Sequence, residues 1–206
     1  MITIFGGQTS RSIRPIWLME EMGLSYRVRQ VDMFRAAEDA EFLEANPAGY
    51  IPVLRDGEVT MVESLAMLQY LMARYGPTAL QPAPANADFA TYLQFLHLGE
   101  AGIATLLMVP TVSRFLAPES ERDNWGARQA RTWATNRVKL VSAQLARTPF
   151  IAGEAFTAAD ISITYALEFG QRQGLLTLGE AEQAYIDRTM GRDAFKRAMD
   201  RSHEGV

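Results

Sequence analysis

A segment rich in proline and alanine, residues 81–87, divides this chain into two halves whose apolar residues are spaced differently. Before the segment, short runs typical of strands alternate with runs of helical spacing. After it, every apolar run has helical spacing. Alternating strands and helices favour an α/β unit with crossover connections. We therefore expect an α/β domain over residues 1–77, a linker over 78–87 and an all-helical domain over 88–206.

The first half is expected to contain strands and helices in the order βαβαββα. The expected strands are residues 2–5, 26–31, 51–54 and 59–62, and the expected helices are residues 13–22, 36–45 and 64–75. Asp56-Gly57 lies between the last two strands, and this dipeptide is preferred in tight hairpin turns. Ser64 is a suitable N-cap for the third helix.

The second half is expected to form a bundle with helices over residues 88–110, 118–148, 157–169, 179–185 and 193–201. Thr157 and Asp160 have the spacing of a capping box, and Phe156 with Ile161 supplies a hydrophobic staple around the start of that helix. This motif is therefore interpreted as structural. We expect Thr157→Ala to cost about 0.5–2 kcal/mol of stability.

Composition excludes several classes of function. The chain has no cysteine and two histidines, which excludes a disulfide scaffold, a zinc-finger array, a cysteine nucleophile and a multi-histidine metal centre, so no metal is expected. A formal net charge of −4 argues against a nucleic-acid binder.

No membrane segment is expected. The N-terminus lacks the basic start and long apolar run of a signal peptide. The longest apolar segment, residues 102–116, is shorter than the roughly 20 residues that cross a bilayer, and it is interpreted as a buried helix bent at Pro110. We expect a cytoplasmic protein.

Four motifs in order carry a resemblance that covers nearly the whole chain. They are Ser10-Arg-Ser-Ile-Arg14 leading into residues 17–24, Asn46-Pro-Ala-Gly-Tyr-Ile-Pro-Val-Leu54, Glu63-Ser-Leu-Ala66, and Phe150 to Ile161. With this order and spacing the chain resembles the cytosolic glutathione S-transferases of bacterial type. The resemblance implies a thioredoxin-like N-terminal domain, an all-helical C-terminal domain, and glutathione as co-substrate.

The loop before the first helix is implied to activate the glutathione thiol. Counting back from residues 20–23 puts Thr9 at the position where family members usually carry the catalytic hydroxyl. Ser10 follows directly, and a shift of one residue in the loop would give this role to Ser10 instead. Arg11 could replace the hydroxyl as the partner of the thiolate. Residues 5–14 contain no tyrosine or cysteine, which excludes the tyrosine and cysteine versions of the mechanism. The alternative is that Thr9, Ser10 and Ser12 are only loop and cap residues.

Two further motifs are implied to hold the tripeptide. The Ile51-Pro52 bond would be cis and leave the Ile51 backbone to pair with the cysteinyl part, whereas without the resemblance a trans proline on an edge strand is favoured. Glu63 and Ser64 would hold the ammonium and carboxylate of the γ-glutamyl part at a helix N-terminus. The alternative there is a plain capped helix with a solvated glutamate.

The sequence departs from the family at the glycyl end of glutathione. Family members commonly place basic residues at two positions that here are Glu38 and Tyr50. Either Arg35 moves in, Tyr50 contributes its hydroxyl, or affinity for glutathione is modest. These departures favour the alternative function, a non-catalytic binding or stress-response interaction protein of the same fold.

The resemblance further implies conjugation of glutathione to an electrophilic apolar or aromatic small molecule, as in detoxification, with ether or thioether cleavage, peroxide reduction or isomerisation as related chemistry. The acceptor would lie against the helices after the linker, with candidate lining residues that could equally be core: Glu100, Thr105, Met108, Thr111 and Phe115. A homodimer is implied, and the preference for arginine over lysine suits a bacterial source.

Overall fold

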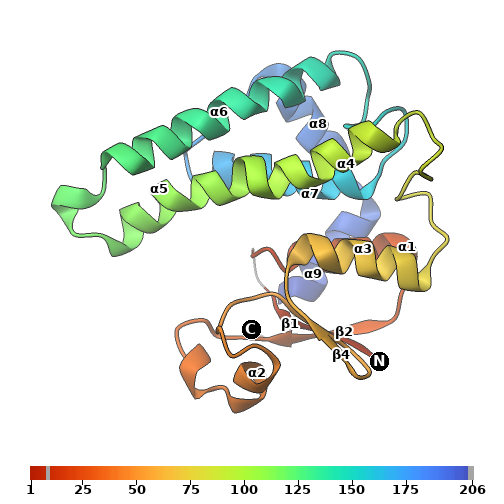
Figure 1. The fold of residues 1–206 in the computed structure, drawn as a ribbon, viewed down its shortest axis with the longest axis vertical. Coiled ribbons are helices and arrows are strands. Elements are labelled where there is room, and N and C mark those ends of the chain that lie inside the picture. The colour runs from red at the N-terminus through yellow and green to blue at the C-terminus, as the bar shows by residue number, and fades with distance from the viewer. Residues whose placement is uncertain (8–9, 204–206) are drawn as a thin grey trace. The chain divides into compact units, whose positions relative to one another are not determined.

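The computed structural model describes residues 1–7 and 10–203 and divides the chain into two compact units. The first unit comprises Met1–Thr78 with Gly191–Val206, and the second comprises Ala79–Met190. Figure 1 shows a sheet with helices in the first unit and a set of helices in the second. The expected fold class, an α/β thioredoxin-like domain with a helical domain, is confirmed.

The sheet of the first unit has the strand order β2-β1-β3-β4. Its strands are β1 (Ile2–Gly6), β2 (Tyr26–Gln30), β3 (Val53–Asp56) and β4 (Val59–Met61). β1 runs parallel to β2 and antiparallel to β3, which is antiparallel to β4. A parallel pair needs a crossover, and the connection from β1 to β2 contains α1 (Ile13–Met22).

The other helices of the first unit are η1 (Ala36–Glu38), α2 (Ala40–Ala45), α3 (Ser64–Tyr75) and α9 (Asp193–His203). The prediction of one continuous helix over 36–45 was wrong, because η1 and α2 are separate elements. Asp39 interrupts it, because its carboxylate accepts a hydrogen bond from the Phe42 amide (3.1 Å) and caps α2. The hairpin loop lies one residue later than expected, because Asp56 still pairs with Val59.

The last helix belongs to a different domain from the one expected, since all of residues 88–206 were predicted to lie in the helical domain. Helix α9 groups with the first unit. The ring of Phe195 meets the ring of Trp17 on α1 edge-on, with centroids 4.8 Å apart. The Arg192 guanidinium makes two hydrogen bonds, 2.6 and 2.7 Å long, to the Glu21 carboxylate. Apolar and ionic contacts therefore hold α9 against α1.

The second unit is entirely helical over its regular elements. These are α4 (Phe89–His97), the π-helical η2 (Leu98–Ala104), α5 (Thr105–Leu116), η3 (Glu119–Glu121), α6 (Trp125–Leu145), α7 (Ala158–Arg172) and α8 (Glu180–Met190). Helix α7 is its core element, since most of its residues are buried. Gly99 allows η2 to approach α7, because a Cβ there would lie 2.4 Å from the Ser162 hydroxyl.

The helix expected over 88–110 was predicted too short, because α5 continues through Pro110 to Leu116, as expected for the apolar segment 102–116. A proline inside a helix removes one hydrogen bond, and its ring crowds the carbonyl four residues before it, so it usually kinks the helix. The helical run Phe89–Leu116 is consequently longer than the apolar segment expected, and by length and composition it could cross a membrane. Half of its apolar window is buried, and core helices pass the same test of length and composition. Its last turn is not buried as expected, since Phe115 is 65% exposed.

The expected capping box at the start of α7 is confirmed. The Asp160 carboxylate accepts hydrogen bonds from the Thr157 amide (2.8 Å) and the Thr157 hydroxyl (3.1 Å). It also accepts hydrogen bonds from the Ile151 amide (2.8 Å) and the Tyr185 hydroxyl (2.9 Å). Asp160 therefore connects the loop before α7 with α8, beyond its local role as a cap.

Candidate functional site

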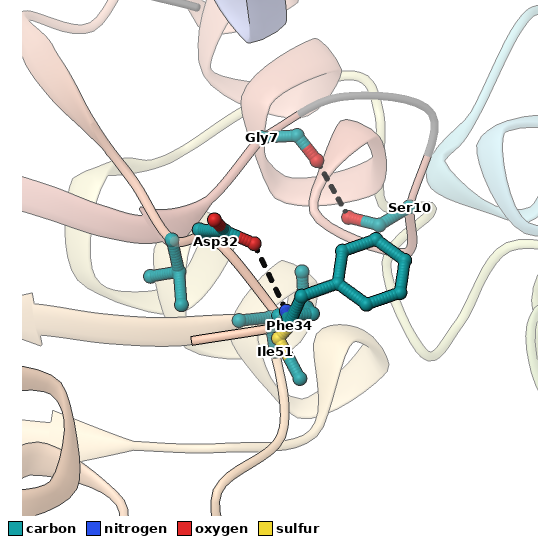
Figure 2. Close-up of a pocket in the computed structure, with 7 residues that line it drawn as sticks. Gly7, Ser10, Asp32, Phe34 and Ile51 are labelled. Atoms are coloured by element: carbon teal, nitrogen blue, oxygen red, sulfur yellow. Dashed lines mark hydrogen bonds between the residues drawn. The ribbon is translucent and has the colours of Figure 1, made fainter. Parts of the chain in front are cut away.

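A cavity of about 210 Å³ opens in the first unit where β1 and β2 end. Figure 2 shows Ser10 and Phe34 at this cavity, with Asp32 and Ile51 nearby. Its lining residues come from three loops: Gly7, Ser10, Val31, Asp32, Met33, Phe34 and Ile51. The loops after β1, after β2 and before β3 therefore build one wall each.

Two glycines allow the loop after β1 to approach its neighbours. Gly6 has φ 152°, and a Cβ there would lie 1.9 Å from the Ser12 hydroxyl. Gly7 has φ 111°, and a Cβ there would lie 1.9 Å from the Gln30 side-chain oxygen. A side chain at either position would therefore require Ser12, Gln30 or the loop itself to move, and both positive φ values favour glycine.

Ser10 occupies the cavity side of this loop, while Thr9 lies outside the described residues. The Ser10 oxygen lies 2.9 Å from the Gly7 carbonyl and 2.8 Å from the Ser12 hydroxyl, and it accepts a hydrogen bond from the Ser12 amide (3.2 Å). A hydroxyl has one proton, so donation to the Gly7 carbonyl leaves Ser12 as donor to Ser10. Turning that proton toward a bound thiolate would break the bond to Gly7.

Ser64 does not have the N-cap role expected for it. Glu63 occupies the N-cap position of α3, and Ser64 is the first helical residue. The Ser64 hydroxyl accepts a hydrogen bond of 3.1 Å from the guanidinium of Arg14, which is fully buried on α1. Because arginine only donates, the Ser64 proton remains available for an acceptor. Sequence reasoning missed Arg14, since a charged residue in a buried helical turn has no local signal.

Glu63 has φ 72°, the only positive value outside glycine among residues 1–7 and 10–203. Such a conformation costs about 1–3 kcal/mol and is often found at functional sites. The Tyr50 hydroxyl donates to the Glu63 carboxylate across 3.5 Å. Partial burial, followed by the charge of Glu63, raises the pKa of Tyr50, which keeps its hydroxyl a donor.

The remaining candidates for glutathione binding are placed as follows. The Ile51-Pro52 bond is cis as expected, and Ile51 lines the cavity that contains Ser10. Arg11 is partly exposed in the turn before α1. Arg35 is paired with Glu38 through two hydrogen bonds of 3.1 and 2.7 Å, and both side chains are largely exposed. Arg35 is therefore already held by a carboxylate.

The acceptor candidates all lie in the second unit, and the cavity described above contains none of them. Glu100 accepts a hydrogen bond of 2.8 Å from the Thr105 hydroxyl. Thr111 is buried and donates to the Leu107 carbonyl (2.7 Å), which fits a core role. Met108 is half-buried and Phe115 is exposed. Their role in binding an acceptor stays a prediction.

Sequence reasoning missed the wall formed by Val31, Asp32, Met33 and Phe34. The available signal was a polar residue directly after the strand expected over 26–31. The Asp32 carboxylate accepts a hydrogen bond of 2.9 Å from the Phe34 amide, which turns the chain at this edge of the cavity. Within the described part of the chain, no group of three or more acidic or histidine residues could hold a metal ion.

Comparisons with known proteins agree with this architecture. A family model for the N-terminal domain of glutathione S-transferases matches residues 6–79. Glutathione S-transferase GstB of Escherichia coli is 29% identical over 169 residues, covering 79% of this chain and 80% of that protein. Glutathione S-transferase 3 of Schizosaccharomyces pombe is 25% identical over 186 residues, covering 85% of this chain and 76% of that protein.

Solved structures extend the similarity across both units. A glutathione transferase from Methylococcus capsulatus has a TM-score of 0.85 at 22% identity and covers 98% of both chains. A theta class glutathione S-transferase from Xanthomonas axonopodis, solved with glutathione bound, has a TM-score of 0.76 at 27% identity and covers 96% of both chains. In its motifs, its sheet order and its relatives, the chain is similar to the glutathione S-transferases, and its residues 6–79 match the N-terminal domain of that family.

Proposed function

We propose that this protein is a glutathione transferase whose first unit binds glutathione and stabilises its thiolate. The observation that carries the proposal is that Ser10 and Ile51 line one cavity, although they are far apart in the sequence. This cavity offers a hydroxyl for the sulfur beside a backbone segment for the cysteinyl residue. The relatives described above are named as glutathione S-transferases, which supports the proposal.

A hydroxyl at this position is sufficient for thiol activation. A free thiol has a pKa of about 8.5, and lowering it by about two units requires about 2.7 kcal/mol of preference for the anion. A hydrogen bond to a charged group contributes about 1.5–3 kcal/mol, and a helix N-terminus adds roughly 0.3–1 kcal/mol. Ser10 lies in the turn that leads into α1, so we propose that both contributions act on a thiolate beside it. Thr9 remains the alternative hydroxyl, and Arg11 the alternative cationic partner.

The γ-glutamyl group of glutathione is assigned to the start of α3. Its carboxylate would accept the Ser64 proton and meet the positive end of the helix. Its ammonium would pair with the Glu63 carboxylate, which the backbone conformation at Glu63 and the Tyr50 hydroxyl hold in place. Pro52 and Ile51 then position the cysteinyl residue between this end and Ser10.

The acceptor is proposed to be an apolar or aromatic electrophile held by the second unit. Met108, Thr105, Glu100, Thr111 and Phe115 are the candidate contacts. A thiolate at this site could equally cleave an ether or thioether, reduce a peroxide or isomerise a substrate through an adduct. Detoxification in the cytoplasm by a homodimer, without nucleic acid or membrane as partners, is the setting that we propose.

One observation favours a second candidate, a non-catalytic glutathione-binding protein. Glu38 pairs with Arg35, the cation nearest the expected glycyl site, and this pairing weakens the case for tight binding of glutathione. Turnover separates the two candidates, since a binder takes up glutathione without consuming an acceptor.

The test is conjugation of glutathione to a chlorinated nitroaromatic by the wild type, Thr9→Ala and Ser10→Ala. Loss of the activating hydroxyl should lower kcat/KM about tenfold to a hundredfold. In the pH profile of kcat/KM, the apparent pKa of the glutathione thiol should rise, because its thiolate has lost a hydrogen bond. Ser142→Ala is a matched control, because this hydroxyl donates to the Val138 carbonyl within α6. Unchanged rates in both variants would refute hydroxyl activation, and no heat of binding at millimolar glutathione would refute the function.

A further inference from the structure

A second cavity, of about 290 Å³, lies within the second unit between the end of α6 and one face of α8. Helix α8 packs against α6 in this unit (Figure 1). The lining residues come from α8 and from the loop after α6 with the last residue of that helix: Leu145, Arg147, Thr148, Pro149, Ala181, Ala184, Tyr185 and Arg188. None of these described lining residues is a candidate for binding glutathione or its acceptor, so the cavity is considered independently of the proposed function.

Two guanidinium groups give this cavity a positive charge. Arg147 and Arg188 are both exposed, and no described lining residue is acidic. Within residues 1–7 and 10–203 neither arginine forms an ion pair: Arg188 donates to the neutral carbonyl of Pro149, and the Arg147 side chain makes no hydrogen bond. Both charges are therefore available to an anion.

The ends of the two helices do not cancel these charges. Helix α6 ends at Leu145, two residues before Arg147, and Arg188 is in the last turn of α8. A helix C-terminus carries about half a negative charge, so a whole guanidinium charge exceeds it. The neighbouring carboxylate, Asp187, is not a lining residue and accepts a hydrogen bond of 2.8 Å from the Gln183 side chain. A net positive charge therefore remains at the cavity.

The segment that leads into the cavity is also positively charged. Residues 124–153 contain five arginines and lysines and no aspartate or glutamate, in a chain with a formal net charge of −4. Arg131 and Arg137 of α6 donate to backbone carbonyls, those of Leu175 (2.9 Å) and Gly102 (3.2 Å), and these neutral partners leave their charges in place. Such a run of one sign of charge attracts anions to the surface, most strongly at low salt.

The rest of the lining is mostly apolar. The Tyr185 hydroxyl donates to the buried Asp160 carboxylate (2.9 Å), so Tyr185 offers its ring to the cavity. Leu145, Pro149 and the alanines of α8 add aliphatic surface. The volume is near the lower end of the range for small-molecule sites, which suits a molecule with a single ring. We propose that this cavity binds a small organic carboxylate, with its carboxylate at Arg147 and Arg188 and its apolar body against α8.

The experiment follows binding of benzoate to the full-length protein by NMR, through the backbone amide signals of Thr148 and Ala184. Benzamide, which has the same ring without the charge, is the reference ligand. We expect benzoate to bind with a Kd of about 1 mM at low ionic strength and benzamide to bind at least about threefold more weakly. Added salt should weaken the binding of benzoate, because both arginines are exposed.

Three variants test the two cations. Arg147→Gln and Arg188→Gln should each raise the Kd of benzoate about threefold to tenfold, since each removes one charged hydrogen-bond donor. Arg122→Gln is the matched control: this exposed arginine also donates to a backbone carbonyl, that of Ala117 (3.2 Å), and it is not a lining residue. Arg147→Gln removes no contact within the described residues, so it tests the charge even where Arg188→Gln lowers stability in urea unfolding.

Any of three results would overturn the inference: benzoate leaves the amides of Thr148 and Ala184 unshifted, benzamide binds as tightly as benzoate, or Arg147→Gln binds benzoate like the wild type. The assay contains no glutathione and measures no turnover. Its outcome is therefore separate from that of the tests of the proposed function.

Discussion

The buried carboxylate of Asp160 should make the stability of the second unit depend on pH in a defined direction. Asp160 is fully buried and accepts hydrogen bonds from Ile151, Thr157 and Tyr185. Burial disfavours its charged form, whereas these hydrogen bonds favour it. Burial has the larger effect and raises the pKa of Asp160 to about 6.

The size of the effect follows from this shift. The unfolded chain has an aspartate pKa of about 3.9, so between that value and about 6 the folded protein keeps a proton that the unfolded chain has lost. Stability therefore falls as pH rises through this window. The stability associated with protonated Asp160 is fully present below about pH 4. About 2 kcal/mol of the free energy of unfolding is lost between pH 4.5 and 7.

Asp160→Asn removes the titration and keeps the shape of the side chain. Its free energy of unfolding, measured with urea by tryptophan fluorescence in a Trp17→Phe background so that Trp125 and Trp133 of the second unit give the signal, is compared with that of the parent protein at both pH values. The difference between wild type and variant should shrink by about 2 kcal/mol from pH 4.5 to 7. Asp187→Asn, an exposed position, serves as control. A difference that grows with pH would mean that the hydrogen bonds outweigh burial.

Three further predictions concern stability and binding. Glu63→Gly should stabilise the protein by about 1 kcal/mol, because glycine adopts φ 72° without strain, and should weaken glutathione binding; a destabilised variant in urea unfolding would contradict the first part. Arg192→Ala should cost about 1 kcal/mol through its paired hydrogen bonds to Glu21, whereas Lys196→Ala, at a mostly exposed pair, should cost almost nothing, and equal losses would refute this ranking. Thr157→Ala should lower stability by about 0.5–2 kcal/mol, and a variant as stable as the parent would remove its role as a cap.

Much of the fold could be predicted because its signals are local. Gly23 ends α1 in a left-handed conformation, and Thr157 with Asp160 begins α7. Such caps depend on residues within one helical turn of each other. Predictions failed where two local signals competed, as at Asp39, which caps a helix in the middle of a run expected to be continuous.

The motifs of the candidate site could be predicted from the sequence, but several contacts between distant residues of the site could not. The cis bond before Pro52 was expected from the resemblance. The bond from Arg14 to Ser64 was not, because it joins residues 50 positions apart and replaces the capping role that the local sequence indicated. Asp32 was missed because its place in the cavity depends on how the loops after β1 and β2 lie together.

Composition, periodicity and caps act over a few residues, so the order of elements, the fold class, the lack of a cysteine nucleophile and the start of α7 could all be predicted from the sequence. The packing of α9 on α1, the hydrogen bond from Tyr185 to Asp160, and the cavity that Ser10 shares with Ile51 and Asp32 became visible only in the three-dimensional structure. These contacts join distant segments, and they form only when buried apolar surfaces bring the segments together.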